Sequence, residues 1–352
     1  EYTAKKYLNR HGLFSVPLLF KRGEKMNFES RPLGVIPSPP DYRDYRLNQF
    51  TDTMKEFPKY YLAPPFKSED DIPIYDQGNT SMCVAFTGAL ITEQQEYHET
   101  GKFIRMSPGW IYGNRKTGMY MGEGMVPREA WAALCEDGVP YYDDLPITGS
   151  FAECYGHVWQ KREALKKKAL NQKKLSYVAV TLKDADEIRT AIMKCGFINV
   201  SIAVYKDFYK VGKDGFLANT SGSIYGYHSV TGVGFFEESG KVYIIIANSW
   251  GREYGKNGLC YMPYNYKGIQ EIWAITDMQR KVLEANIPAQ VIPPGHFVIP
   301  YRGLFEAEQA ESINWGWNEK GKVYAEAILP PAKRRKISVV EGSKDIVVET
   351  LE

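Results

Sequence analysis

The stretch Asp76-Gln77-Gly78-Asn79-Thr80-Ser81-Met82-Cys83-Val84-Ala85-Phe86 contains a cysteine where a helix is expected to begin. The pattern of apolar residues predicts that this helix runs from about Ser81 to Glu99, with Thr80 and Ser81 as candidate N-caps. The first turn of a helix carries unpaired N–H groups, which favour an anion placed beside them. Because a thiol reacts as its thiolate, the stretch predicts a helix that presents Cys83 as a nucleophile with a lowered pKa.

Two later segments supply the partners that such a thiol needs. Tyr227-His228-Ser229-Val230-Thr231-Gly232-Val233-Gly234 places His228 in strand-like sequence, and Ala247-Asn248-Ser249-Trp250-Gly251 follows another apolar run. An imidazole beside the thiol takes up its proton and holds it in an ion pair. The amide oxygen of Asn248 is suited to orient that imidazole, and the indole of Trp250 is suited to cover their hydrogen bond.

The loop before the cysteine offers donors for an oxyanion. A tetrahedral intermediate in acyl transfer needs preorganised donors beside its negative oxygen. The side-chain amide of Gln77 and the backbone N–H of Cys83 suit this role, because the short separation between them lets the chain loop back onto the helix start. A buried cysteine or a strand histidine taken alone is usually structural, so the prediction of an active site depends on the joint occurrence of the three segments.

In their order, the three segments resemble the motifs of the papain family of cysteine peptidases, and the separation of Cys83 and His228 also fits that family. The resemblance covers about residues 40–278. It implies a papain-like two-lobe α+β fold and a cysteine endopeptidase whose catalytic residues are Gln77, Cys83, His228 and Asn248. Tyr42-Arg43-Asp44-Tyr45 is similar to the bacterial branch of the family.

The same resemblance implies a set of substrate-binding residues. Gly122-Glu123-Gly124-Met125-Val126 looks like the family's glycine strand, which binds the backbone of the substrate. Substrate contacts, with an apolar preference at the second residue before the cut, are expected from Gly124, Met125, Val126, Ala203, Tyr227, Ser229 and Trp250. Thr80 stands where the family usually has a disulfide cysteine, and Val84 where it usually has tryptophan, so the disulfide and the fine substrate preference stay open.

Helical patterns dominate the first half of the chain and strand patterns the second. Helices are expected at 127–135, 153–171 and 184–194, and strands at 200–204, 227–236 and 242–247. This order indicates an α+β protein with a helical lobe and an antiparallel sheet or barrel lobe. We expect the peptidase domain over residues 41–280, preceded at 1–40 by an arm or possible pro-segment. Because residues 1–40 carry no catalytic motif, they are a candidate inhibitory leader of a zymogen.

Residues 286–352 predict a small appended α+β module. Strands are expected at 297–299 and 323–329, a helix at 303–310 and a hairpin turn at 341–343. Several of its segments, among them the run from Val298 to Ala307, resemble the stalk-type module named after copper amine oxidase N-termini. That resemblance implies a secreted or cell-surface protein that associates with the cell surface or cell wall. No copper is inferred, because His296 stands alone.

Composition argues against several other classes of protein. Lys and Arg number 44 against 42 Asp and Glu, and the basic runs have few aromatic neighbours, so we expect no nucleic-acid partner. No apolar run reaches the ~20 residues of a membrane helix, so we expect no transmembrane segment. Neither zinc-ligand spacing nor a disulfide framework is visible, so we expect no metal or cofactor at the five cysteines: Cys83, Cys135, Cys154, Cys195 and Cys260.

Two other functions stay open on the sequence. A catalytically silent scaffold of papain fold would bind partners through the appended module, although the intact Gln77, Cys83, His228 and Asn248 argue against it. A cell-wall peptide hydrolase would use a similar cysteine–histidine pair, although the Asn-Ser-Trp-Gly segment favours the branch that cleaves proteins.

Overall fold

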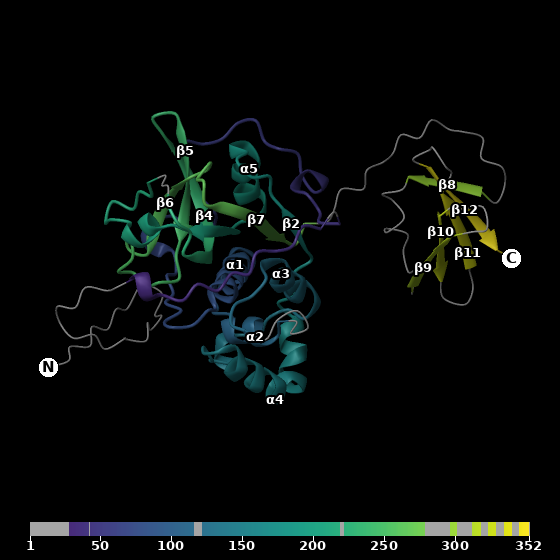
Figure 1. Ribbon diagram of the computed structural model, residues 1–352, viewed down its shortest axis with the longest axis horizontal. Helices are drawn as coiled ribbons and strands as arrows, with labels where there is room; N and C mark the ends of the chain where they lie inside the picture. Colours follow the sequence, from purple (N-terminus) through teal and green to yellow (C-terminus); the bar gives the residue numbers. More distant parts are fainter. Residues whose placement is uncertain are drawn as a thin grey trace. The chain divides into compact units, whose positions relative to one another are not determined.

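The computed structural model describes residues 28–41, 43–115, 122–218 and 222–278 in full, and the backbone of five strands between residues 296 and 351. The chain divides into two compact units, Glu1–Lys281 and Val282–Glu352 (Figure 1). The three segments that predict the active site all lie in the first unit.

One half of the first unit, the helical lobe, is built around α1 (Cys83–Thr100). α1 is buried over most of its length, which explains why its sequence lacks a clear polar face. It ends at Gly101, which adopts the left-handed conformation that glycine tolerates (φ 69°). α2 (Pro108–Gly113) and α3 (Pro127–Glu136) pack against α1, and α4 (Phe151–Leu170) packs against α2.

The start of α1 differs from the prediction. Met82 is the N-cap residue in place of Thr80 or Ser81, and its side chain accepts no capping hydrogen bond. The hydroxyl of Thr80 donates instead to the carbonyl oxygen of Gln77, 2.7 Å away, inside the loop before the helix. The first N–H groups of α1 therefore have no side-chain cap and lie beside the thiol of Cys83.

The other half, the sheet lobe, is an antiparallel sheet in the order β2-β7-β3-β4-β5-β6, with β1 paired to β4. The long strand β4 shifts register between Gly232 and Gly234. A Cβ on Gly234 would lie 2.3 Å from the carbonyl oxygen of Tyr61, so glycine lets β1 approach β4. α5 (Ala185–Cys195) packs against β3, β4 and β7. The strands are β1 (Tyr60–Leu62), β2 (Ser176–Ala179), β3 (Ile198–Val204), β4 (Gly226–Glu238), β5 (Lys241–Ala247), β6 (Leu259–Pro263) and β7 (Ile269–Thr276).

Short 3-10 helices lie in the connections between these elements. Those among the described residues are η1 (Phe28–Ser30), η2 (Leu47–Gln49), η3 (Glu69–Asp71), η5 (Tyr142–Asp144) and η6 (Lys206–Lys210).

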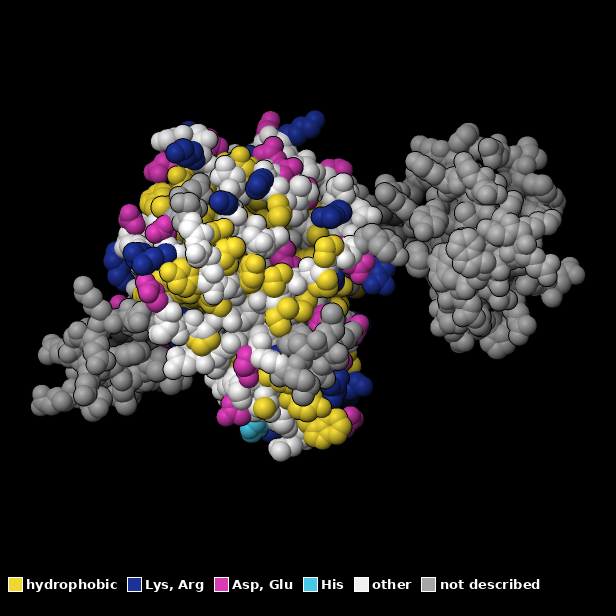
Figure 2. Space-filling model, in the orientation of Figure 1, with side chains coloured by type: hydrophobic (Ala, Val, Ile, Leu, Met, Phe, Trp, Pro, Cys, Tyr) yellow, Lys and Arg dark blue, Asp and Glu magenta, His cyan; other side chains and the backbone are white. Residues whose placement is uncertain are grey.

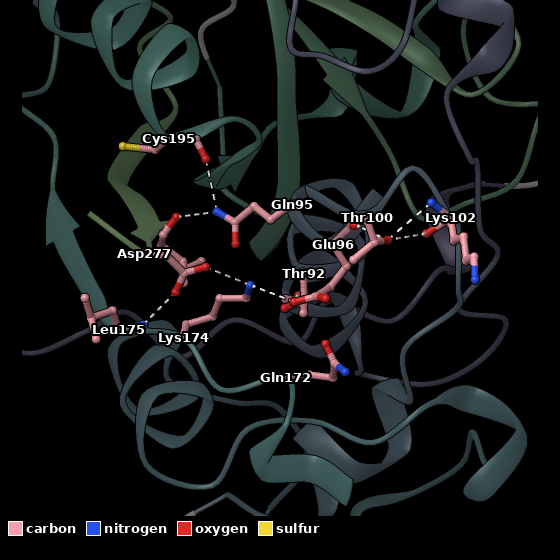
Figure 3. A network of polar contacts seen from close by, with 12 residues as sticks. Thr92, Gln95, Glu96, Thr100, Lys102, Gln172, Lys174, Leu175, Cys195 and Asp277 are labelled. Atoms are coloured by element: carbon pink, nitrogen blue, oxygen red, sulfur yellow. Dashed lines mark hydrogen bonds and ion pairs between the residues drawn. The ribbon is translucent and has the colours of Figure 1, made fainter. Parts of the chain in front are cut away.

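A buried lysine helps to hold the two lobes together. Figure 3 shows Lys174, whose side chain is 1% exposed, between Glu96 of α1 and Asp277 just after β7. Its ammonium nitrogen lies 3.3 Å from the Glu96 carboxylate and 3.0 Å from the Asp277 carboxylate. Gln95 of α1 also donates to the main-chain oxygen of Ile275 in β7, at 2.7 Å. Because a buried partner left without its hydrogen bond costs about 1–3 kcal/mol, these contacts resist separation of the lobes.

The described part of the N-terminal region packs against the first unit. Val35 is 8% exposed and belongs to the hydrophobic core. In Figure 1 this dark purple segment crosses between α1 and the sheet lobe before it reaches β1. Residues 1–27 of the predicted arm lie outside the described residues.

The second unit contains a five-stranded antiparallel sheet in the order β8-β12-β11-β10-β9. Its strands are β8 (His296–Pro300), β9 (Ser312–Trp317), β10 (Val323–Ile328), β11 (Arg334–Val339) and β12 (Asp345–Leu351). β8 and β10 overlap the strands predicted at 297–299 and 323–329. The helix predicted at 303–310 lies outside the described residues.

The α+β class is confirmed, with helices and an antiparallel sheet in one unit. The helices predicted at 81–99, 127–135, 153–171 and 184–194 correspond to α1, α3, α4 and α5. The sequence analysis did not predict α2, a buried helix of about one and a half turns, or the strands β1, β2, β6 and β7. α2, β1, β2 and β6 are short, and their sequences carry too few residues to establish a period.

The surface of the first unit is mixed in charge. Figure 2 shows acidic and basic side chains interspersed over the visible face, with no large area of a single sign. Across the part of the chain that the structure describes, no helix has both the length and the apolar composition needed to span a bilayer.

Candidate active site

Cys83 opens α1, and its side chain is completely buried. Main-chain hydrogen bonds reach the thiol from Ser229, from Gly34 and from the first turn of α1 at Val84 and Cys83 itself. The contact with Ser229 is informative because this residue follows His228 on β4. The structure therefore brings the start of the helix and the strand of the predicted base to the same point.

His228 is oriented by Asn248, as its position in the sequence suggests. The Nε2 atom of His228 lies 2.8 Å from Oδ1 of Asn248. Because that oxygen can only accept, Nε2 carries the hydrogen and Nδ1 is left as an acceptor. Nδ1 is buried and has no hydrogen-bond partner among the described residues. The imidazole thus presents one basic nitrogen that is available for a proton.

Aromatic rings enclose this hydrogen bond. The ring centroid of Trp250 lies 4.8 Å from that of His228, and Phe208 meets the imidazole edge-on at 6.0 Å. Trp250 is fully buried, with Tyr209 stacked on it at 5.6 Å. The indole therefore lies where a shield for the His228–Asn248 contact is expected.

Burial keeps both reactive groups neutral in this arrangement. Loss of solvent raises the pKa of the Cys83 thiol to about 11, and the main-chain hydrogen bonds offset this only in part. Burial lowers the pKa of His228 to about 4, against the effect of the Asn248 hydrogen bond. The expectation of a lowered thiol pKa is wrong for this arrangement, because desolvation outweighs the main-chain hydrogen bonds that reach the thiol.

Residues 28–38, here called the covering segment, contribute to this burial, since Gly34 contacts the thiol through its main chain. The main-chain N–H of Met125 donates to the Gly34 carbonyl at 2.7 Å, and Ile36 N–H donates to the Met125 carbonyl at 3.0 Å. On the other side, Val35 N–H donates to the carbonyl oxygen of Tyr227 at 3.1 Å. Residues 34–36 of the covering segment therefore lie between residues 124–126 and β4, paired with both through the main chain.

Side chains anchor the covering segment near its start. Arg31 forms two hydrogen bonds to the carboxylate of Asp76, at 2.5 and 3.1 Å, and a third to the carbonyl oxygen of Gly78 at 3.1 Å. Phe28 stacks on Trp250 with ring centroids 6.1 Å apart and meets Tyr254 edge-on at 5.5 Å. Both anchors contact the loops that carry the predicted catalytic residues.

The predicted oxyanion donor already binds a carbonyl. Nε2 of Gln77 donates to the main-chain oxygen of Pro32 in the covering segment at 3.2 Å, and to that of Thr80 at 2.6 Å. Its Oε1 accepts a hydrogen bond from the hydroxyl of Ser249 at 2.7 Å. Gln77 is thus fixed to the segment of Asn248 and points its amide N–H groups toward a peptide carbonyl.

Of the predicted substrate-binding residues, those on the glycine strand contact the covering segment. A Cβ on Gly124 would lie 2.9 Å from the Gly34 carbonyl oxygen, and its φ is 100°, so both space and conformation require glycine. Met125 makes the main-chain bonds described above. Val126 is buried and is the N-cap residue of α3.

The predicted substrate-binding residues of the sheet lobe differ in what they contact. Tyr227 binds the covering segment through its carbonyl, and Ala203, fully buried, is its cross-strand partner on β3. Ser229 contacts the thiol through its main chain, whereas its hydroxyl is hydrogen-bonded to Thr87 and Asn199.

Sequence reasoning missed the residues that hold the glycine strand. The guanidinium of Arg115 donates to the carbonyl oxygens of Gly122 and Gly124. The hydroxyl of Tyr112 accepts from Gly124 N–H at 2.7 Å and donates to the Glu123 carboxylate at 2.7 Å. Neither residue belongs to a recognisable motif, and only the packing of α2 against this strand brings them together.

The remaining cysteines show no sign of reactivity or metal binding. All five cysteines are free thiols. Burial raises the pKa of Cys135, Cys154, Cys195 and Cys260 to about 12. Within the described ranges, no group of three or more His, Cys, Asp or Glu side chains is arranged to hold a metal ion.

Comparison with known proteins places this geometry in a family. Residues 68–277 match the family model described as "Papain family cysteine protease". The chain is 29% identical over 244 residues to "Thiol protease aleurain-like" of Arabidopsis thaliana, covering 60% of this chain and 65% of that protein. It is 41% identical over 83 residues to "Cathepsin B-like cysteine proteinase 3" of Caenorhabditis elegans, which is 24% of this chain and 22% of that protein. The chain therefore spans less than two thirds of both curated relatives.

A solved structure agrees in fold. Xylellain, a cysteine protease from Xylella fastidiosa, superposes with a TM-score of 0.57 at 23% identity, covering 73% of this chain and 99% of that one. At this identity the likeness concerns the fold, which is the α+β arrangement of helices and antiparallel sheet described above. With the family match extending over more than half of its length, the chain belongs to the papain family of cysteine proteases.

Proposed function

We propose that this chain is a cysteine endopeptidase in which Cys83 is the nucleophile and His228 the base. The observation that carries the proposal is the state of His228, whose Nε2 is bound to Asn248 while its buried Nδ1 has no partner among the described residues. Transfer of the thiol proton to Nδ1 produces a thiolate beside the N–H groups of α1. The thiolate then attacks the carbonyl carbon of the substrate.

The bonds made and broken follow from these positions. Attack on the peptide carbonyl forms a carbon–sulfur bond and an oxyanion, which the Gln77 side-chain amide and the Cys83 N–H stabilise. Collapse breaks the carbon–nitrogen bond, and the imidazolium of His228 returns its proton to the leaving amine. Water, deprotonated by His228, then hydrolyses the thioester and regenerates the thiol.

The covering segment supports a regulatory part of the proposal. It buries the thiol, binds the Gln77 amide through Pro32 and pairs with Met125, so a substrate cannot reach these groups while it is in place. We propose that the chain with this segment seated is a zymogen-like inhibited form. Displacement of the covering segment restores solvent to Cys83 and His228 and allows the ion pair to form.

The proposed substrate is a polypeptide with an apolar side chain at the second position before the cut. Support comes from Met125, Val126 and Ala203, whose side chains are apolar and buried. The covering segment itself places the apolar Val35 beside Met125 and Tyr227.

Digestion of a protein substrate tests the proposal. The assay uses the chain with Gly34→Ala, in which the added Cβ would lie 2.0 Å from the carbonyl oxygen of Ser81 and so displaces the covering segment. This chain and the same chain with Cys83→Ala are incubated in parallel with casein and with purified peptidoglycan. Cleavage of casein that disappears in Cys83→Ala supports the endopeptidase. Release of wall peptides without casein cleavage would favour a cell-wall hydrolase, and no cleavage of either, with Cys83 unreactive to thiol reagents, would favour a silent scaffold.

For the second unit we propose attachment to a cell surface, in a secreted protein of the bacterial branch of the family. The support is the resemblance of residues 288–344 to a stalk-type module and of Tyr42-Arg43-Asp44-Tyr45 to that branch. Sedimentation of the full chain with bacterial wall fragments, compared with a chain that ends at Lys281, tests this. Equal sedimentation of both chains would refute it.

A further inference from the structure

A line of four buried polar side chains crosses the junction of the two lobes. Ser201 Oγ donates to Asn199 Oδ1 at 3.2 Å, both on β3. Asn199 Nδ2 donates to Ser229 Oγ on β4 at 2.8 Å. Ser229 Oγ then donates to Thr87 Oγ1 on α1 at 3.0 Å. The line therefore begins in the sheet lobe and ends on the central helix of the helical lobe.

All four side chains are removed from solvent. Asn199, Ser201 and Ser229 are 0% exposed, and Thr87 is 3% exposed. Each hydrogen bond runs in the same direction, from donor to the next acceptor, which strengthens the series by mutual polarisation. Because a buried polar group without a partner is costly, the four residues fix one relative position of their elements.

The line contacts the elements that carry the reacting pair. Thr87 lies one turn after Cys83 on α1, so its side chain is on the same side of the helix. Ser229 follows His228 directly on β4, and its main chain reaches the thiol of Cys83. The hydrogen bond from Ser229 to Thr87 is thus a side-chain link between the helix of the nucleophile and the strand of the base.

We propose that Thr87, Ser229, Asn199 and Ser201 form a positioning line that sets the distance between the Cys83 sulfur and Nδ1 of His228. This inference rests on the proposed function. Apolar packing between α1 and β4 tolerates small sliding movements, whereas a hydrogen bond weakens steeply when donor and acceptor shift. Proton transfer from the thiol requires such a fixed separation, and misplacement by about 1 Å costs about 100-fold in rate.

Two threonines of the same helix provide a matched test. Thr87→Val removes the hydroxyl that accepts from Ser229, whereas Thr92→Val removes an equally buried hydroxyl that donates within α1, to Gly88 O at 3.0 Å. Both changes replace a hydroxyl by a methyl group in the same helix. Thr87→Ser keeps the acceptor and serves as the conservative rescue.

We expect kcat to fall while KM stays nearly unchanged. For Thr87→Val, kcat on a peptide substrate falls by about 10- to 100-fold with KM within about twofold, and the alkylation of Cys83 slows in parallel. Each change is made in a parent chain that carries Gly34→Ala, so the covering segment is displaced in the same way in the parent and in every variant. Thr92→Val and Thr87→Ser keep the kcat of this parent. Thermal unfolding of each variant measures the loss of stability separately.

The outcomes separate this inference from the proposed function. If the Gly34→Ala parent is active and its kcat and Cys83 alkylation are unchanged by Thr87→Val, the positioning role is overturned and the peptidase is left intact. If the Gly34→Ala parent cleaves no peptide and its Cys83 is no more reactive than the other cysteines, both are overturned. If Thr87→Val does not fold, Ser229→Ala breaks the same hydrogen bond from β4, and an unchanged kcat there overturns the inference equally.

Discussion

Gly34 is the position where the covering segment is most sensitive to a single added atom. A Cβ at this residue would lie 2.0 Å from the carbonyl oxygen of Ser81 and 2.6 Å from its carbonyl carbon. Both are main-chain atoms of the loop that leads into α1, so no side-chain rotation relieves the contact. Gly34→Ala therefore forces the covering segment away from the thiol of Cys83.

The size of the effect follows from the cost of overpacking. Inserting a methyl group where main chain already lies typically costs about 1–3 kcal/mol. If that cost falls on the covered form alone, the ratio of uncovered to covered chain rises by about 5- to 150-fold. The main-chain bonds to Met125 and Tyr227 are the contacts that this displacement lengthens.

Alkylation of Cys83 by iodoacetamide, followed by peptide mass spectrometry, measures the uncovered fraction. Gly34→Ala is expected to raise the alkylation rate by the factor given above and to raise casein cleavage in the same direction. Gly156→Ala on α4 is the control, because a Cβ there meets no atom within 4 Å. A Gly34→Ala rate equal to that of the wild type and of Gly156→Ala would refute the reasoning about the covering segment.

Three other predictions follow from contacts of the first unit. Arg31→Ala removes the bidentate contact to Asp76 and is expected to raise the rate of Cys83 alkylation by about 10-fold or more, since a hydrogen bond to a charged group contributes about 1.5–3 kcal/mol. An unchanged alkylation rate would show that Arg31 does not hold the covering segment in place. Burial raises the pKa of Glu93 from its ordinary value of 4.5 to about 7, so between these pH values the folded chain keeps a proton that the unfolded chain has lost. The free energy of unfolding therefore falls by roughly 3 kcal/mol as the pH rises from about 4.5 to about 7. Glu93→Gln is expected to remove this fall in urea denaturation series at about pH 4.5 and about pH 7.5; a fall of the same size in the variant would contradict the assignment. Asn248→Ala leaves Nε2 of His228 without its acceptor and is expected to lower kcat by about 10- to 100-fold, measured on a peptide substrate, and an undiminished kcat would remove Asn248 from the mechanism.

The catalytic candidates were accessible to sequence reasoning because their chemistry is local. Cys83 opens a helix, and the loop before it carries Gln77. His228 stands near the start of one apolar run, and Asn248 directly follows another. Residue type and position along an element are enough to predict such groups, although not the distances between them.

The protonation state of the site could not be read from the motifs. It depends on burial, to which residues 28–38 contribute although they contain no catalytic side chain and look unremarkable in sequence. Their main-chain pairing with Met125 and Tyr227 leaves no motif in the sequence. Burial raises the pKa of Cys83 and lowers that of His228, the reverse of the shifts expected for an ion pair.

The supporting residues are also a product of tertiary packing. Lys174 would be assigned to a solvated surface from its sequence neighbours, yet its side chain is 1% exposed between Glu96 and Asp277. Thr87 and Asn199 are more than a hundred residues apart in the sequence. They belong to one line of hydrogen bonds, through Ser229, only because α1 packs against β3 and β4. The pattern of residues within a single helix or strand does not predict such a contact.

The central claim is that the imidazole of His228 activates the thiol of Cys83 once the covering segment is displaced. The most direct test compares alkylation rates of all five cysteines in Gly34→Ala and in Gly34→Ala with His228→Ala, at neutral pH. We expect Cys83 to react fastest of the five and to slow by about 10-fold or more without the imidazole. Equal rates for Cys83 in the two proteins, or a Cys83 no faster than the other four cysteines, would contradict it.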